Sequence, residues 1–242
     1  MATNKQAAAP AAPEKEVKVD FFTRNSKLIY GCLIGAVVLI IAGFLYFNHR
    51  NKMKEASANN SLVAIAHMEQ AVATADSTEF RLALEGDGEA PGFLQLLDKY
   101  GARGGEAIYL NTAICELNLG RYEDALAHAR KYDTDDPVMA SRAQLLIGHA
   151  QMQLGQWDAA RKSFLEAAKV DSELAAAPLL NAGLAAEKLG QYDEALKCYQ
   201  KIADRYPADA LYADGVYFGE FYEGTRIDAH IARVEALIEK SK

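Results

Sequence analysis

The hydrophobic positions change their pattern once along the chain. Between Leu28 and Phe47 they form one uncharged run, LIYGCLIGAVVLIIAGFLYF. Because a helix rises about 1.5 Å per residue, this run reaches about 30 Å, the thickness of a bilayer's hydrocarbon core. From about Lys52 onward, apolar residues recur instead with the 3.6-residue period of amphipathic helices. The pattern predicts an all-α chain in which a transmembrane helix, residues 28–47, precedes a helical domain.

Two other interpretations of the apolar run are less favoured. A core helix of a globular domain would have a polar side, whereas this run is apolar on all faces. A cleaved signal peptide would have a shorter apolar stretch, and Arg50, Lys52 and Lys54 occupy the place where cleavage should occur. Positive charges lie on both sides of the run with a slight excess before it, which barely favours a cytoplasmic N-terminus.

The segments on either side of this run differ in composition. QAAAPAAPEKEVKVD combines alanine, proline and charge and offers too little apolar surface to fold. We therefore expect residues 1–27 to form a disordered cytoplasmic tail. Residues 48–105 are expected to hold a linker and atypical N-terminal helical hairpins, which EGDGEAPG at 85–92 interrupts with three glycines and a proline.

A heptapeptide recurs three times at one interval, as LGRYEDA, LGQWDAA and LGQYDEA. Its glycines, Gly120, Gly155 and Gly190, stand 35 residues apart. A fixed period in this range is typical of solenoids. We expect each unit to be two antiparallel helices joined at the glycine, which can turn left-handed without a Cβ penalty. The expected units are 106–140, 141–175 and 176–207.

Other repeated positions indicate how each unit packs. Tyr122, Trp157 and Tyr192 follow the elbows and are expected to open the second helices. Small residues recur where the two helices of a unit approach most closely, at Ala113, Gly148, Gly183, Ala125, Ala160 and Ala195.

The ends of the units also carry signals. Pro137 and Pro207 are expected to stop second helices, because proline cannot continue a helix. Residues 208–242 are expected to form C-terminal capping helices, beginning in LYADGVYFGEFY and closing with the amphipathic IDAHIARVEALIEK. A solenoid needs such a cap over its last exposed interface.

The small pair, glycine elbow, aromatic, alanine and late proline of these units resemble the tetratricopeptide repeat, or TPR. That resemblance implies a TPR-type right-handed helical solenoid. The whole layout is also similar to the YfgM-type membrane-anchored TPR proteins of bacterial inner membranes, through FFTRNSKLI, ALEGDGEAPGFLQLLDKYGARGGEAIYLNTAI and IADRYPADA. This second resemblance implies a cytoplasmic N-terminus, a single inner-membrane span and a periplasmic TPR domain. It also implies association with the Sec translocon and with periplasmic chaperones that receive emerging chains.

The sequence offers no constellation for catalysis. Its formal net charge of −7 disfavours nucleic acid as a partner. The three cysteines form no C-x-x-C pair, and the five histidines are scattered without metal-ligand spacing. Nucleophile elbows, phosphate loops and H-E-x-x-H motifs are absent from the sequence. We expect a binding protein and not an enzyme, with no cofactor and no metal.

A mostly apolar stripe on the first helices of the units is expected to line the concave wall of the array. Its predicted partner-binding residues are Leu110, Asn111, Ile114, Leu117, Arg142, Leu145, His149, Met152, Leu180, Leu184 and Glu187. Asn111 and Asn181 suggest fragments of a clamp for a C-terminal carboxylate, but its basic partners are largely missing. The stripe favours apolar or helical segments. The competing interpretation is that the closing helix or the leading helices already cover this wall.

These observations predict a membrane-anchored TPR adaptor that mediates protein–protein interactions on the periplasmic side of the inner membrane. Its expected partners are translocon subunits, a periplasmic chaperone or emerging chains. The alternative is a structural scaffold for another envelope complex, in division or secretion. Whether the chain forms homo-oligomers stays open.

Overall fold

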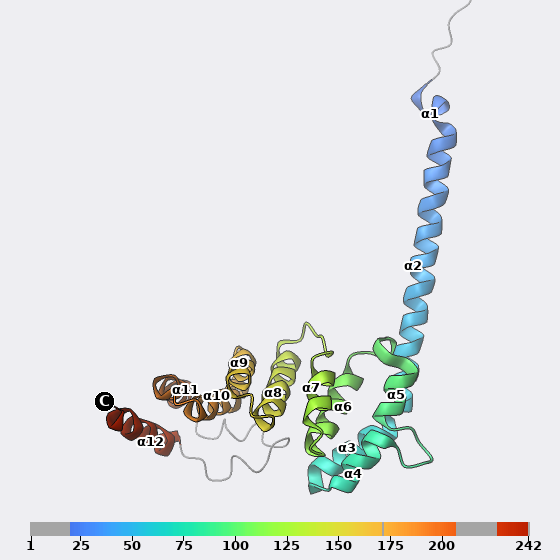
Figure 1. Cartoon of the computed structure of the whole chain (residues 1–242). Coiled ribbons are helices and arrows are strands. Elements are labelled where there is room, and N and C mark those ends of the chain that lie inside the picture. The colour runs from blue at the N-terminus through green and yellow to red at the C-terminus, as the bar shows by residue number, and fades with distance from the viewer. Residues whose placement is uncertain (1–19, 171, 207–226, 242) are drawn as a thin grey trace, which may run out of the picture. The chain divides into compact units, whose positions relative to one another are not determined.

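A computed structural model describes residues 20–170, 172–206 and 227–241 of the chain (Figure 1). All regular elements of these residues are helices, accompanied by one isolated bridge between Gly86 and Pro91. The chain divides into two compact units, residues 1–49 and residues 50–242. The all-α prediction is therefore confirmed for the described part of the chain.

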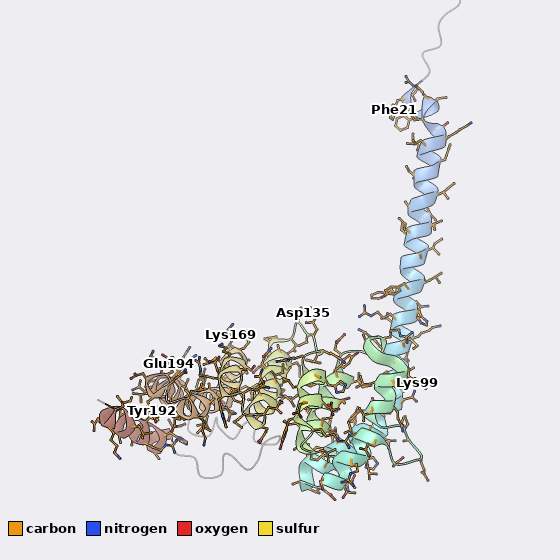
Figure 2. The ribbon with its side chains drawn as sticks, viewed as in Figure 1. Phe21, Lys99, Asp135, Lys169, Tyr192 and Glu194 are labelled. Atoms are coloured by element: carbon orange, nitrogen blue, oxygen red, sulfur yellow. The ribbon has the colours of Figure 1, made fainter. Side chains whose placement is uncertain are left out.

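The first unit is an exposed helix preceded by a single turn. Helix α1 spans Phe21–Arg24, and the long α2 spans Ser26–Asn60, of which the part up to residue 49 belongs to this unit. Phe21 projects from α1 (Figure 2). Residues 21–24 form α1 and residues 26 and 27 begin α2, whereas residues 1–19 of the expected tail lie outside the described part. The Asn25 side chain supports this start by donating a hydrogen bond to the carbonyl of Phe21, at 3.0 Å.

Helix α2 continues well beyond the apolar run that the sequence predicts as a span. It passes from the uncharged stretch into NKMKEASANN without a break. That segment contains neither glycine nor proline and is rich in good helix formers, so nothing in it ends the helix. Within the second unit, the far end of α2 buries Ser57.

The second unit is a series of helices, each packed against its neighbours along the chain. Its leading helices are α3 (Leu62–Thr74), α4 (Ser77–Glu85), α5 (Phe93–Tyr100) and the short η1 (Gly101–Gly104). The repeat helices are α6 (Ala107–Asn118), α7 (Tyr122–Ala129), α8 (Pro137–Gln153), α9 (Trp157–Ala167), α10 (Ala176–Lys188) and α11 (Tyr192–Arg205), with η2 (Glu173–Ala175) before α10. The last is α12 (Ile227–Lys240), and the expected cap segment 208–226 lies outside the described residues.

The repeated glycines form the elbows that the sequence predicts. Gly120, Gly155 and Gly190 have φ of 75°, 71° and 70°, in the region where a side chain is disfavoured. At each elbow the following N–H reaches back to a carbonyl of the preceding helix, as from Gln156 to Gln151 at 2.8 Å. Second helices then begin at Tyr122, Trp157 and Tyr192, which confirms the positions predicted for the aromatic residues.

Pro137 has a different role from the predicted one. Helix α7 already ends at Ala129, and Pro137 is the first residue of α8. The Asp136 carboxylate caps this helix by accepting from the N–H groups of Val138 and Met139, each at 2.9 Å. Proline suits the first helical turn because the N–H it lacks has no intrahelical partner there. The first helix of the second unit thus begins before the expected boundary at 141, and Pro207 lies outside the described residues.

Candidate partner-binding surfaces

The predicted stripe lies on α6, α8 and α10, the first helices of the three repeat units. Leu110, Leu117, Leu145, His149, Met152 and Leu180 are buried. The half-buried members of the stripe are Asn111, Ile114, Arg142, Leu184 and Glu187. A partner would therefore meet mainly these half-buried side chains, and the groove itself stays a prediction.

His149 joins two repeat units inside the stack. Its ring meets Phe164 edge-on, with centroids 5.2 Å apart at 73°, and the Asn181 amide lies 3.3 Å from Nε2. Burial lowers the pKa of His149 to about 3, so the imidazole is neutral at neutral pH. Asn181 is itself fully buried. This pair of residues holds α8 to α10, which leaves Asn181 little access to a partner's carboxylate.

Glu187 is the last residue of the predicted stripe along the chain, and it contacts α12. Arg233 of α12 donates to both carboxylate oxygens, from Nη2 at 2.6 Å and from Nε at 3.1 Å. The Tyr199 hydroxyl donates to the same carboxylate at 2.6 Å. Two-point contact by a guanidinium fixes the angle of approach as well as adding energy. The clasp therefore sets how α12 lies on the last repeat unit.

Apolar contacts complete the seat of α12. Val234 is fully buried in a cluster with residues of α10 and α11, and Ile227, Ile231 and Ile238 pack at its edge. Leu184 of the predicted stripe lies in the same cluster. Two residues of the predicted stripe therefore lie at this seat: Glu187 pairs with Arg233 of α12, and Leu184 packs against the cluster that holds Val234.

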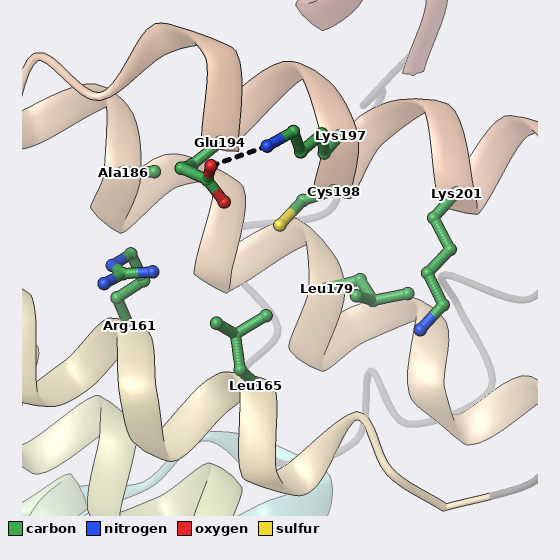
Figure 3. A pocket seen from close by; sticks show the side chains of 8 residues that line it. All are labelled: Arg161, Leu165, Leu179, Ala186, Glu194, Lys197, Cys198 and Lys201. Carbon is green, nitrogen blue, oxygen red and sulfur yellow. Dashed lines mark hydrogen bonds and ion pairs between the residues drawn. The ribbon is translucent and has the colours of Figure 1, made fainter.

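A notch opens between α9, α10 and α11, outside the predicted stripe (Figure 3). It has a volume of about 170 Å³. Four of the lining side chains are apolar or behave as apolar groups: Leu165, Leu179, Ala186 and Cys198. The remaining lining side chains are charged: Arg161, Glu194, Lys197 and Lys201.

The charges of the notch are partly matched. Lys197 Nζ lies 2.7 Å from a carboxylate oxygen of Glu194, which lowers the pKa of that carboxyl. Arg161 pairs with Asp158 on its own helix at 3.3 Å. Burial raises the pKa of Cys198 to about 11, so its thiol stays protonated and behaves as a small apolar group. The lining carries three cationic groups and one anionic group.

Neither the contact between Glu187 and Arg233 nor the notch was predicted from the sequence. Glu187 and Arg233 are 46 residues apart, and no spacing rule connects them. The notch could have been predicted from the repeat register. The residues 35 positions before Ala186 and Cys198, in the preceding unit, are polar, whereas these two are not. Reading the deviations from a repeat, as well as its matches, would have found it.

The family comparison agrees with the repeat architecture of the second and third units. Residues 145–210 match the sequence profile of the family described as Tetratricopeptide repeat. The structure resembles two crystal structures of MamA, with TM-scores of 0.46 and 0.48 at 17% and 16% identity. The matches cover 71% and 76% of this chain and 94% and 90% of those chains. A search of curated proteins finds no match.

The region matched by the family profile begins in α8 and runs past the end of α11, across the second and third repeat units. The described part of the chain is all-α, and its second and third repeat units are similar to the tetratricopeptide repeat, a repeat that mediates protein–protein interaction.

Proposed function

We propose that the chain is a membrane-anchored TPR adaptor on the periplasmic side of a bacterial inner membrane. In this proposal it is an ancillary factor of the Sec translocon and of periplasmic chaperones. It binds proteins and performs no reaction, and it needs no cofactor or metal. The observation that carries the proposal is the combination in one chain of a protein-binding repeat with a long apolar helix.

The apolar part of α2 supports the anchor. Val38, Leu39, Ile40 and Ile41 are all more than half exposed, at 57%, 74%, 70% and 52%. Four consecutive helical residues, about 100° apart, point to all sides of the helix. Their exposure is costly in water and favourable in lipid, where a helix also satisfies its own backbone. Helix α2 is long and apolar enough to cross a membrane.

The packing of α12 indicates what kind of segment the repeats accept. It is an amphipathic helix anchored by one buried valine and one charged pair on the last unit. Partner segments of the same kind fit the half-buried residues of the stripe, because helix-in-groove binding relies on apolar anchors at helical spacing. The anchor raises the effective concentration of the repeats at the membrane. Partners at the membrane can therefore be bound even where each single contact has a modest affinity.

Cross-linking the full-length chain in intact membranes tests the proposal. The expected neighbours are translocon subunits, a periplasmic chaperone and emerging chains. A chain cross-linked to none of these would contradict the proposal. Finding components of a division or secretion complex in their place would establish the alternative, a structural scaffold for that assembly.

The proposed location has a separate test. A reporter enzyme that is active only in the periplasm is fused after residue 242, and a matched fusion carries a reporter active only in the cytoplasm. We expect activity from the first fusion alone. Activity from the cytoplasmic reporter would remove the periplasmic function.

A further inference from the structure

The repeat units contain a recurring polar bridge between their two helices. In the first unit a carboxylate oxygen of Glu116 lies 2.8 Å from Nδ1 of His128. In the second unit the Ser163 hydroxyl donates to the Gln151 side chain, also at 2.8 Å. Both pairs are 12 residues apart, and the second lies 35 residues after the first. The bridge is therefore a feature of the repeat register.

The third unit departs from this rule, because its polar bridge joins Glu187 to Tyr199, one residue later on each helix. The register places Ala186 and Cys198 at the two bridge positions. A methyl group and a protonated thiol cannot make the side-chain bridge, and together they fill less space than a glutamine with a serine or a glutamate with a histidine. Both residues line the notch between α9, α10 and α11 (Figure 3). The notch thus lies at the two register positions where the third unit has no polar pair.

The charge around the notch is opposite to that of the chain as a whole. The sequence carries a net charge of −7, whereas the lining carries Arg161, Lys197 and Lys201 against one glutamate. Within the described residues, Lys201 has no ion-pair partner and the buried Nε of Arg161 has no hydrogen-bond partner. A ligand with negative charge beside an apolar group matches this surface.

We propose that the notch binds a peptide segment with one large apolar side chain flanked by acidic residues. A cavity of about 150 Å³ accommodates benzene, so 170 Å³ suits one leucine or phenylalanine side chain. Glutamate or aspartate on either side would then lie near Lys197 and Lys201. The inference rests on the proposed adaptor function and states the chemistry of one partner. This site is separate from the predicted stripe on the first helices.

A photoreactive peptide tests the notch directly. The probe is acetyl-Asp-Glu-photoleucine-Glu-Asp-amide, added to the full-length chain in detergent micelles. We expect mass spectrometry to locate the cross-links on α9, α10 and α11 at the notch, and unlabelled peptide with leucine to compete. A probe with lysine in place of all four acidic residues should label at least tenfold less. Equal labelling by the two probes, or cross-links elsewhere, would overturn the proposal.

A matched variant fills the notch with the polar pair that the second unit carries at the same register positions. Ala186→Gln with Cys198→Ser recreates the pair that bridges the helices of the second unit. We expect this variant to keep the helical circular dichroism of the native chain and to lose at least tenfold in labelling. A folded variant that labels as well as the native chain would contradict the site.

A second variant tests the charge of the notch without changing the core, and so remains informative if the Ala186→Gln, Cys198→Ser variant does not fold. Lys197 and Lys201 are exposed, so Lys197→Glu with Lys201→Glu leaves the core untouched. Labelling by the acidic probe should fall at least tenfold, and labelling by the lysine probe should rise. Unchanged labelling by both probes would refute the charge match. If the notch fails these tests while cross-linking in membranes still finds the expected neighbours, the adaptor function stands without this site.

Discussion

A methyl group placed on Gly148 would lie 2.4 Å from Cε1 of Phe164, closer than any ordinary carbon contact. Gly183 and Tyr199 repeat this relationship one unit later, at 2.3 Å. Both aromatic rings are fully buried and so have no room to swing aside. In the first unit the same register positions hold Ala113 and, opposite it, alanine instead of an aromatic residue. Each unit therefore matches a small residue on one helix to the size of the residue on the other.

Replacing Gly148 with alanine should destabilise the repeat unit. Overpacking costs about 1–3 kcal/mol, and the better helix propensity of alanine returns about 1 kcal/mol. We expect a net loss of up to about 2 kcal/mol in the free energy of unfolding. The measurement is urea unfolding of the full-length chain in detergent micelles, followed by the fluorescence of Trp157, the single tryptophan.

A double-mutant cycle isolates the contact. Phe164→Ala alone leaves a cavity, but with Gly148→Ala it recreates the alanine pair of the first unit. The double variant should therefore be less destabilised than the sum of the two single variants, by about 1 kcal/mol or more. Strict additivity of the two changes would show that the ring does not restrict residue 148.

Val234→Asp should detach α12 from the last repeat unit. Val234 is fully buried, and a carboxylate there would lose its hydration without a partner. We expect hydrogen exchange of the α12 amides to accelerate at least tenfold, while α8 and α9 keep their protection. Ala236→Asp, at an exposed position of the same helix, is the matched control. Native protection of α12 in the Val234→Asp variant would mean that this side chain does not hold the helix.

Stability should fall on acidification because of His149. Its pKa is about 3 in the folded chain and about 6.5 in an unfolded one, so the unfolded state binds the proton more tightly between these values. The contribution is complete above pH 6.5 and is lost as the pH drops, by about 2 kcal/mol at pH 5. His67 has the opposite effect on stability upon acidification, because its hydrogen bond with Glu79 raises its pKa. It is unchanged in the His149→Gln variant.

The His149→Gln variant tests this dependence, since glutamine keeps an acceptor for the Asn181 amide and removes the titration. Unfolding free energies at pH 8 and pH 5 should differ by about 2 kcal/mol less in the variant than in the native chain. Equal differences in the two proteins would assign the acid sensitivity to other groups.

The parts of the fold that depend on local chemistry could be predicted from the sequence. The glycine elbows and the aromatic residues after them follow from backbone conformation and a 35-residue register. Pro137 was harder to place, because proline both ends helices and occupies their first turn, and only the Asp136 cap decides between these roles. Helix α2 contains the whole predicted span and continues past it, because no glycine or proline ends it in the segment that follows.

The candidate sites depend on contacts between distant residues, which the pattern does not encode. The Glu187–Arg233 clasp joins α10 to α12 across 46 residues, so the sequence left open whether the closing helix covers the stripe. The burial of Asn181 against His149 likewise follows from the stacking of two units. The notch depends on two residues that break the repeat, and a search for matching positions passes over them.

The central claim, that α2 fixes this repeat protein in a membrane, is tested most directly by alkaline carbonate extraction of membranes. Val38→Asp with Ile41→Asp places two charges in the apolar run, at a cost of about 2.5–3.5 kcal/mol each in a bilayer. Asn51→Asp with Asn59→Asp is the control at exposed positions of the same helix. We predict that the native chain and the control stay in the membrane pellet and that the Val38→Asp, Ile41→Asp variant is released. Release of the native chain by carbonate would contradict the account.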